Sequence, residues 1–232
     1  MFLYQPHDGY RYNSDSIFLY DFIGRFALRG AALDVGCGVG IVGLLAARDL
    51  PLAMTIIDKQ PCMIDYAVHN YALNGLTVKA HAEDFALFNA GEQYDVIFSN
   101  PPFYDPAVTQ STDARLNTAR YAHHLPLEVF ISGAKRLLRP RGHVLFCYDA
   151  KQIDRVLAEL RAVRLNPETI RFVHSKSDRE AHIALIAARA NSRSMVRVLP
   201  PLIVFDSQSR YLPEAQAAFD RAATHSIKGE RA

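Results

Sequence analysis

The sequence predicts an α/β fold built on a doubly wound, mostly parallel sheet, and three observations support this. The chain has 232 residues, of which 50% are hydrophobic, so residues 1–232 can bury a full core as one domain. Apolar segments typical of buried strands alternate regularly with segments of helical periodicity. Polar and glycine-rich motifs directly follow the strand-like segments. Because such sheets bind ligands at the carboxyl ends of their strands, we expect the functional site there.

The expected elements follow in order along the chain. Residues 1–30 should form an N-terminal cap and a helix to about Phe26, for which Ser14-Asp15-Ser16 is a suitable N-cap. Residues 31–206 should form the core. We expect strands near 31–35, 53–58, 76–81, 94–99, 142–148, 168–174 and 181–189, and helices near 41–48, 61–73, 126–138 and 151–163. Residues 207–232 should form a C-terminal extension that is frayed from Thr224 to a flexible end.

A glycine-rich loop follows the first core strand. Its pattern, Asp34-x-Gly36-x-Gly38-x-Gly40, differs from the dinucleotide fingerprint G-x-G-x-x-G. Glycine allows positive φ and lets the backbone touch a ligand directly. The Asp34 carboxylate would repel a pyrophosphate, but it can bind a ligand ammonium directly or through water. The loop therefore indicates a small-molecule site, with a purely structural glycine turn as the alternative.

Acidic residues follow the next two strands. Asp58 closes the second strand, where a carboxylate can accept hydrogen bonds from two ribose hydroxyls. It could instead cap the helix that begins near Pro61. Glu83 and Asp84 follow the third strand, and either carboxylate could meet an adenine amino group. Asp84 is the preferred candidate.

The fourth strand ends in Asn100-Pro101-Pro102-Phe103, the most informative motif of the chain. Neither proline can continue a ladder, since each lacks an N–H and has φ fixed near −65°. The Asn100 oxygen and the Pro101 carbonyl can accept both hydrogens of a planar amine, while Phe103 stacks on its ring. This grip leaves the nitrogen lone pair free to attack. An ordinary strand-ending turn is the alternative for these four residues.

In this order and spacing, the motifs resemble those of class I S-adenosylmethionine-dependent methyltransferases of the Asn-Pro-Pro-aromatic subset, over roughly residues 1–206. Residues 5–16, 119–123 and 200–206 are similar to signatures of the bacterial tRNA(Val) adenine-N6 methyltransferases. The chain departs from this family in three places. It has Asn13-Ser14-Asp15 where many members have Gly-Thr-Asp, Tyr121 in place of His, and Phe103 in place of Tyr.

The resemblance implies a Rossmann-like sheet of seven strands in the order 3-2-1-4-5-7-6, with the seventh antiparallel and helices on both faces. It implies S-adenosylmethionine as cofactor and transfer of its methyl group to N6 of an adenine in tRNA, beside the anticodon of tRNA-Val. The implied catalytic residues are Asn100, Pro101, Pro102 and Phe103. The implied cofactor-binding residues are Asp34, Gly36, Gly38, Gly40, Asp58, Asp84 and Asp15, the last from its motif position alone.

The distribution of charge favours an RNA partner. Residues 1–150 contain 12 Lys and Arg against 15 Asp and Glu, whereas residues 151–232 contain 14 against 9. A basic second part of the chain, placed on the substrate side of the site, suits a polyanionic partner. The alternative is that these charges only form an ordinary solvated surface. The candidate RNA contacts are Tyr104, Arg115, Arg120, Lys176 and Arg179.

Other classes are disfavoured. The chain lacks an apolar run long enough to span a membrane, and its start does not resemble a secretory signal. Cys37, Cys62 and Cys147 are widely spaced and odd in number, which predicts neither a disulfide framework nor a metal pair and fits the cytoplasm. His123-His124 lack a third ligand at supporting spacing, so we expect no metal. The oligomeric state stays open.

Three rival functions remain. The same motif could methylate N2 of guanine in ribosomal RNA or the glutamine side chain of a release factor, because it grips any planar amine. Glutamine methyltransferases usually carry an N-terminal helical domain, and only about 30 residues precede the glycine loop here, which counts against them. An RNA-binding module with a vestigial methyltransferase fold is the non-enzymatic rival.

Overall fold

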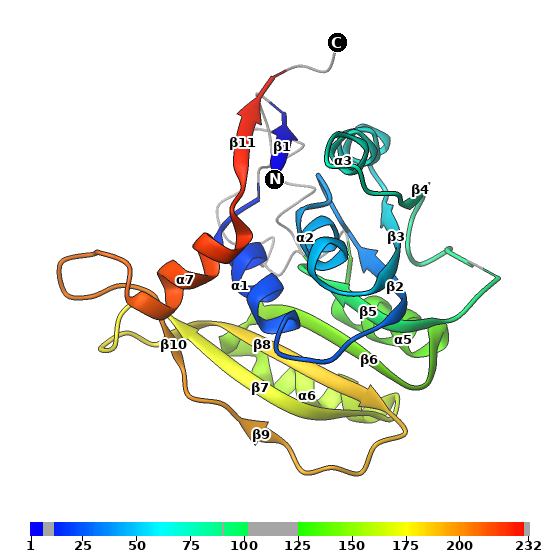
Figure 1. The fold of residues 1–232 in the computed structure, drawn as a ribbon. Coiled ribbons are helices and arrows are strands. Elements are labelled where there is room, and N and C mark those ends of the chain that lie inside the picture. The colour runs from blue at the N-terminus through cyan, green and yellow to red at the C-terminus, as the bar shows by residue number, and fades with distance from the viewer. Residues whose placement is uncertain (7–11, 90, 102–124, 230–232) are drawn as a thin grey trace.

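The computed structural model describes residues 1–6, 12–89, 91–101 and 125–229 (Figure 1). Its main feature is a central sheet of strands in the order β10-β7-β8-β6-β5-β2-β3-β4, with β9 also paired to β7. The strands are β2 (Gly30–Val35), β3 (Leu52–Asp58), β4 (Lys79–Ala82), β5 (Tyr94–Ser99), β6 (Leu138–Asp149), β7 (Leu165–His174), β8 (Ala181–Ala190), β9 (Arg197–Val198) and β10 (Leu202–Ile203).

The seven expected strands and their order are confirmed. From β4 to β7 they lie as β4-β3-β2-β5-β6-β8-β7, and only β8 among them runs antiparallel to its neighbours. In the part of the chain that the structure describes, two short strands are added to the expected seven, because β9 and β10 pair in parallel with β7 and extend the sheet to nine. Each of these added strands has two residues, too few to show any periodicity in the sequence.

Helices cover both faces of the sheet, as expected. On one face lie α1 (Ser14–Ile23), α2 (Ile41–Asp49), α3 (Pro61–Leu73) and α7 (Pro213–Ala222), which share one hydrophobic cluster. On the other lie α5 (Leu127–Leu137) and α6 (Ile153–Ala162), which contribute to a second cluster and are seen behind the sheet in Figure 1. A short 3-10 helix, Ala150–Gln152, leads into α6. Within the described ranges, no helix has the length and apolarity needed to cross a bilayer.

The first helix begins and ends close to the expected positions. The expected N-cap within Ser14-Asp15-Ser16 is wrong, because these residues form the first turn and the N-cap is Asn13, whose side-chain oxygen accepts a hydrogen bond from the Asp15 backbone N–H at 3.2 Å. It ends at Ile23, before Gly24, so Phe26 lies beyond it. Ser16 lies in the first turn of α1 and contacts Asn100 at the end of β5.

The two ends of the described chain meet in a separate small sheet. Strand β1 (Phe2–Gln5) pairs in parallel with β11 (His225–Lys228), so the expectation of fraying from Thr224 is wrong for these residues. Asn70 of α3 supports β1, because its side chain accepts from Tyr4 N at 2.7 Å and donates to Tyr4 O at 3.0 Å. This pairing joins segments more than 200 residues apart, which local polarity does not predict.

Candidate active site

The carboxyl ends of β2, β3 and β5 border one cavity, which is lined by five of the seven predicted cofactor-binding residues and by Asn100. From the predicted set, the cavity is lined by Asp34, Gly36, Gly38, Asp58, Asp84 and Asn100, and also by Glu83. Other lining residues include Tyr12, Ser16, Cys37, Lys59, Met63, Phe85 and Leu125. Two predicted cofactor residues, Gly40 and Asp15, do not line it. The convergence of three strand ends agrees with the expected position of the site.

The glycine loop has the backbone that its sequence predicts. Gly36, Gly38 and Gly40 all have positive φ, at 65°, 54° and 83°. A Cβ built on Gly38 would meet no atom within 4 Å, so the backbone is open on that side. The Gly38 N–H donates to Asp58 Oδ2 at 3.0 Å, which fixes the loop against the end of β3. An exposed glycine backbone beside a carboxylate is suited to close approach by a polar cofactor.

Gly40 allows the start of α2 to pack closely against α3. It is the N-cap of α2, and a Cβ there would lie 3.0 Å from the Cβ of Ala67 in α3. Gly43, which the sequence reasoning missed, is more constrained: a Cβ there would lie 2.6 Å from the Tyr71 hydroxyl and 2.9 Å from Asp34 Oδ2. The direct cofactor role expected for Gly40 stays a prediction.

Asp34 is a buried carboxylate that supports the loop from behind. Its Oδ2 accepts a hydrogen bond from the Gly43 N–H at 2.9 Å, and the residue is 2% exposed. Burial raises its pKa to about 7, against the effect of that hydrogen bond, and the nearby Asp58 carboxylate raises it further. A carboxyl group with this pKa could hold a proton or a ligand cation near neutral pH.

Asp58 lines the cavity, and it is not the N-cap of α3, which is Gln60. Besides holding Gly38, it accepts a hydrogen bond from Gln60 N at 2.9 Å through Oδ1, in the turn that leads into α3. Burial is the main cause of its raised pKa. Its carboxylate also lines the cavity, so ribose binding stays a prediction with support from position.

Glu83 and Asp84 both line the cavity from the segment after β4. Asp84 Oδ1 accepts from Ala86 N at 2.9 Å, and Glu83 Oε1 lies 3.5 Å from His81 Nδ1. The buried ring of Phe85 lines the cavity between them and α5. This segment therefore offers carboxylates and a flat apolar surface, a combination suited to a purine.

Asn100 is held from both sides by two residues that the sequence did not single out as site residues. Its Nδ2 donates to Ser16 Oγ of α1 at 3.0 Å, and its Oδ1 accepts from the Cys147 thiol of β6 at 2.8 Å. Ser16 is 3% exposed and Cys147 is fully buried. Burial, with the Asp15 carboxylate nearby, raises the pKa of Cys147 well above its usual value, so the thiol stays protonated and can donate.

Asp15 lies beside this group and outside the cavity lining. Its side chain is tied within the first turn of α1 by Asn13 Nδ2 at 2.8 Å and Ser14 Oγ at 3.3 Å. Burial raises its pKa, while the neighbouring His182 opposes that shift. A contact between Asp15 and the cofactor stays a prediction.

Some of the remaining predicted residues belong to the part of the chain that the structure describes, and others lie outside it. Pro101 is buried directly after Asn100. Pro102, Phe103, Tyr104, Arg115 and Arg120 lie outside the described residues, as do His123 and His124. Lys176 and Arg179 follow β7 at the same edge of the sheet as Asn100; Lys176 Nζ donates to Ser207 O at 3.3 Å, and Arg179 is exposed. Across the described part of the chain, no cluster of three residues could hold a metal ion.

Comparison with known proteins agrees with this geometry. The model of the methyltransferase small domain family matches residues 15–172. Curated proteins from Yersinia pestis and Yersinia pseudotuberculosis, named tRNA1(Val) (adenine(37)-N6)-methyltransferase, are 34% identical over 121 residues. The match spans 50% of this chain and 48% of each of these proteins, so the chain spans about half the length of the curated relatives it matches.

Solved structures give the same fold. A predicted O-methyltransferase from Agrobacterium tumefaciens has a TM-score of 0.70 at 17% identity, over 92% of this chain and 99% of that one. The 16S rRNA N2 G1207 methyltransferase of T. thermophilus, solved with AdoMet and guanosine, has a TM-score of 0.56 at 18% identity, over 78% and 44%. With the family model matched over most of its length, this chain belongs to the methyltransferase small domain family.

Proposed function

We propose that the protein transfers a methyl group to the exocyclic N6 of adenine in tRNA, at the adenine beside the anticodon of tRNA-Val. The observation that carries the proposal is the fixed Asn100 amide at the carboxyl end of β5, followed by two prolines. The names of the partial relatives from Yersinia support the choice of adenine and tRNA. The proposed setting is the cytoplasm.

The proposed chemistry is mainly one of holding and orientation. The Asn100 oxygen has two lone pairs; Cys147 occupies one, and the other can accept a hydrogen from the substrate amino group. The Pro101 carbonyl is the proposed acceptor for the second hydrogen, and Phe103 is proposed to stack on the base. With both hydrogens held, the nitrogen lone pair leaves conjugation with the ring and can attack a methyl carbon.

The cofactor is proposed to lie along the glycine loop. When bound, S-adenosylmethionine would supply a methyl group on a sulfonium: the S–C bond would break as the N–C bond forms, the sulfur would leave as a neutral thioether, and the methylated nitrogen would lose one hydrogen as a proton to water. Gly36 and Gly38 would contact it through their backbone, Asp58 would bind the ribose, and Glu83 or Asp84 would meet the adenine. The adenine to be methylated must leave its stack to reach such a pocket, as in other base-modifying enzymes.

The direct test uses methyl-labelled cofactor with separate pools of tRNA, ribosomal RNA and soluble protein from a strain that lacks the gene. N6-methyladenosine in digested tRNA, identified by mass spectrometry, is the expected product. Label in N2-methylguanosine or in glutamine would overturn the substrate and keep the chemistry. If no pool is labelled although the protein binds cofactor, the proposed tRNA adenine activity is rejected and the RNA-binding alternative is favoured.

The role of Asn100 has its own prediction. Asn100→Ala should reduce turnover about a hundredfold to a thousandfold, because the substrate amine loses its oriented acceptor. The affinity for S-adenosylmethionine, measured by calorimetry, should change less than twofold, because Asn100 is proposed to contact the substrate amine and not the cofactor. A parallel loss of cofactor affinity would contradict this role.

A further inference from the structure

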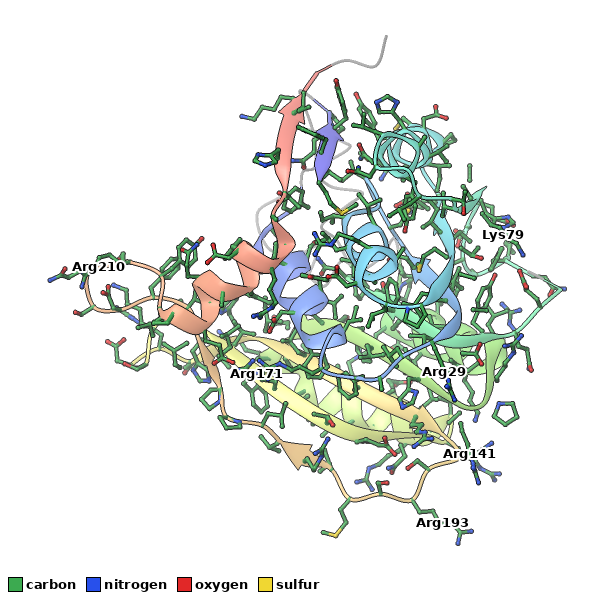
Figure 2. The ribbon with its side chains drawn as sticks, viewed as in Figure 1. Arg29, Lys79, Arg141, Arg171, Arg193 and Arg210 are labelled. Carbon is green, nitrogen blue, oxygen red and sulfur yellow. The ribbon has the colours of Figure 1, made fainter. Side chains whose placement is uncertain are left out.

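A basic surface lies at the edge of the sheet opposite the candidate active site, where the parallel strands begin. Strand β8 is antiparallel, so its end also lies there. The arginines at this edge are Arg29 before β2, Arg139 and Arg141 in β6, Arg161 and Arg164 before β7, and Arg189 and Arg193 at the end of β8. Figure 2 shows Arg29, Arg141 and Arg193 on the same side of the molecule. We call these seven residues the arginine edge.

Few carboxylates neutralise the arginine edge. Asp95 Oδ2 accepts from Arg139 Nη1 at 2.7 Å, and Glu168 accepts from the Ser192 hydroxyl. Glu159, one turn before Arg164, interacts with Arg155. Five arginines make no ion pair with any described residue: Arg29, Arg141, Arg161, Arg164 and Arg193. All five are exposed, so their charges face solvent.

Part of the arginine edge forms a pocket. Its lining comprises Arg161, Arg164, Leu165, Asn166, Asn191, Ser192 and Arg193, with three guanidinium groups and no carboxylate. Arginine forks match phosphate oxygens, and asparagine amides can donate to phosphate and ribose. With Leu165 as the one apolar side chain of the lining, the pocket is suited to a polyanion more than to an apolar peptide.

The backbone adds a separate observation. Arg141 and Arg164 have positive φ, at 66° and 59°, although neither is glycine. A left-handed conformation costs such a residue about 1 kcal/mol, which glycine would avoid. Asn191, at the third turn of this edge, has φ 57° and is one of the residue types that tolerate it. Two turns thus carry an arginine at a conformational cost and present its side chain to solvent.

We propose that the arginine edge binds the phosphate backbone of the RNA substrate, with the pocket of Arg161, Arg164 and Arg193 as its centre. This inference rests on the proposed action on RNA. It assigns two tasks to two edges of one sheet. The cavity at the carboxyl edge selects one nucleotide, and the arginine edge supplies sequence-independent affinity at a distance from it.

The test compares two variants that each lose two positive charges. Arg161→Gln/Arg193→Gln changes the pocket, whereas the control Lys151→Gln/Lys228→Gln changes exposed lysines away from this edge, after the end of β6 and in β11. Labelled total tRNA is titrated without cofactor from 50 to 200 mM salt. For the pocket variant we expect Kd to rise about tenfold and the salt slope to fall by about 1.5, since each lost phosphate contact removes about 0.7–0.9. The control should differ from the original protein less than twofold.

Unchanged melting temperatures in thermal unfolding establish that both variants are folded. Equal affinities and slopes for the two variants would overturn the proposal. Displacement of tRNA by a few millimolar inorganic phosphate would also overturn it, in favour of a free-phosphate site, and displacement by polyglutamate at matched charge would favour an acidic protein. The binding assay does not depend on methyl transfer. If the proposed tRNA methylation is wrong but the arginine edge binds RNA, tRNA affinity still depends on the pocket although no methylated product forms.

Discussion

The contact between Cys147 and Asn100 gives the sharpest prediction about the site. The Asn100 amide is fixed by a donor on one side, the Cys147 thiol at 2.8 Å, and by the Ser16 hydroxyl at 3.0 Å on the other. A hydroxyl can donate or accept a hydrogen bond, so Ser16 alone is compatible with either orientation of the amide. A protonated thiol in this position acts as donor and favours the orientation with Oδ1 toward it. Cys147 should therefore act as a positioning residue.

The magnitude follows from one buried hydrogen bond. Loss of one such bond between neutral groups costs about 1 kcal/mol, which corresponds to about a fivefold change in rate. The thiol is a weak donor, which lowers this figure, but full burial of Cys147 prevents replacement by water, which raises it. For Cys147→Ala we expect kcat to fall about fivefold, while KM for the cofactor changes little.

The assay separates orientation from packing. Steady-state methylation is measured for Cys147→Ala, Cys147→Ser and Ser16→Ala, with thermal unfolding of each. Cys147→Ser restores a donor and should recover most of kcat, although it buries a hydroxyl. Thermal unfolding shows whether each variant is folded at the assay temperature, so that a difference in kcat between folded variants can be assigned to the donor. Equal kcat values for the alanine and serine variants would refute the reasoning.

Two further predictions concern the carboxylate behind the loop. Gly43→Ala should destabilise the protein by about 1–3 kcal/mol, because its Cβ would lie within 3 Å of the Tyr71 hydroxyl and of Asp34 Oδ2; thermal unfolding measures this, and an unchanged melting temperature would contradict the close packing. Asp34→Asn should gain stability relative to the original protein as pH rises from about 4 to about 7. The folded pKa of Asp34 is raised to about 7, so its stabilising contribution is present below the unfolded pKa and is lost as pH rises through the folded one. A pH-independent difference in melting temperature between the two proteins would disprove the shift.

Local sequence determined the strand ends and the groups they carry. The glycine loop, Asp58 and Asn100 each follow a short apolar strand, and parallel strands bring their carboxyl ends to one edge. The sequence alone therefore predicted that these residues lie together at one edge of the sheet. The structure confirms this, because Gly36, Gly38, Asp58 and Asn100 line one cavity. The order of the seven main strands came from the family resemblance, since periodicity contains no information on which strands are neighbours.

Only the tertiary structure decided which residues support this set. Ser16 and Cys147 lie 84 and 47 residues from Asn100, in elements whose local pattern marks nothing unusual. The separate roles of Gly40 and Gly43 depend on how closely α3 approaches α2, and β1, which pairs with β11, is held by Asn70 of α3. A short motif predicts which groups contact a ligand, because the backbone geometry of a few consecutive residues determines where those groups lie. The groups that orient them are set by packing between distant elements, which becomes definite only when the chain is folded.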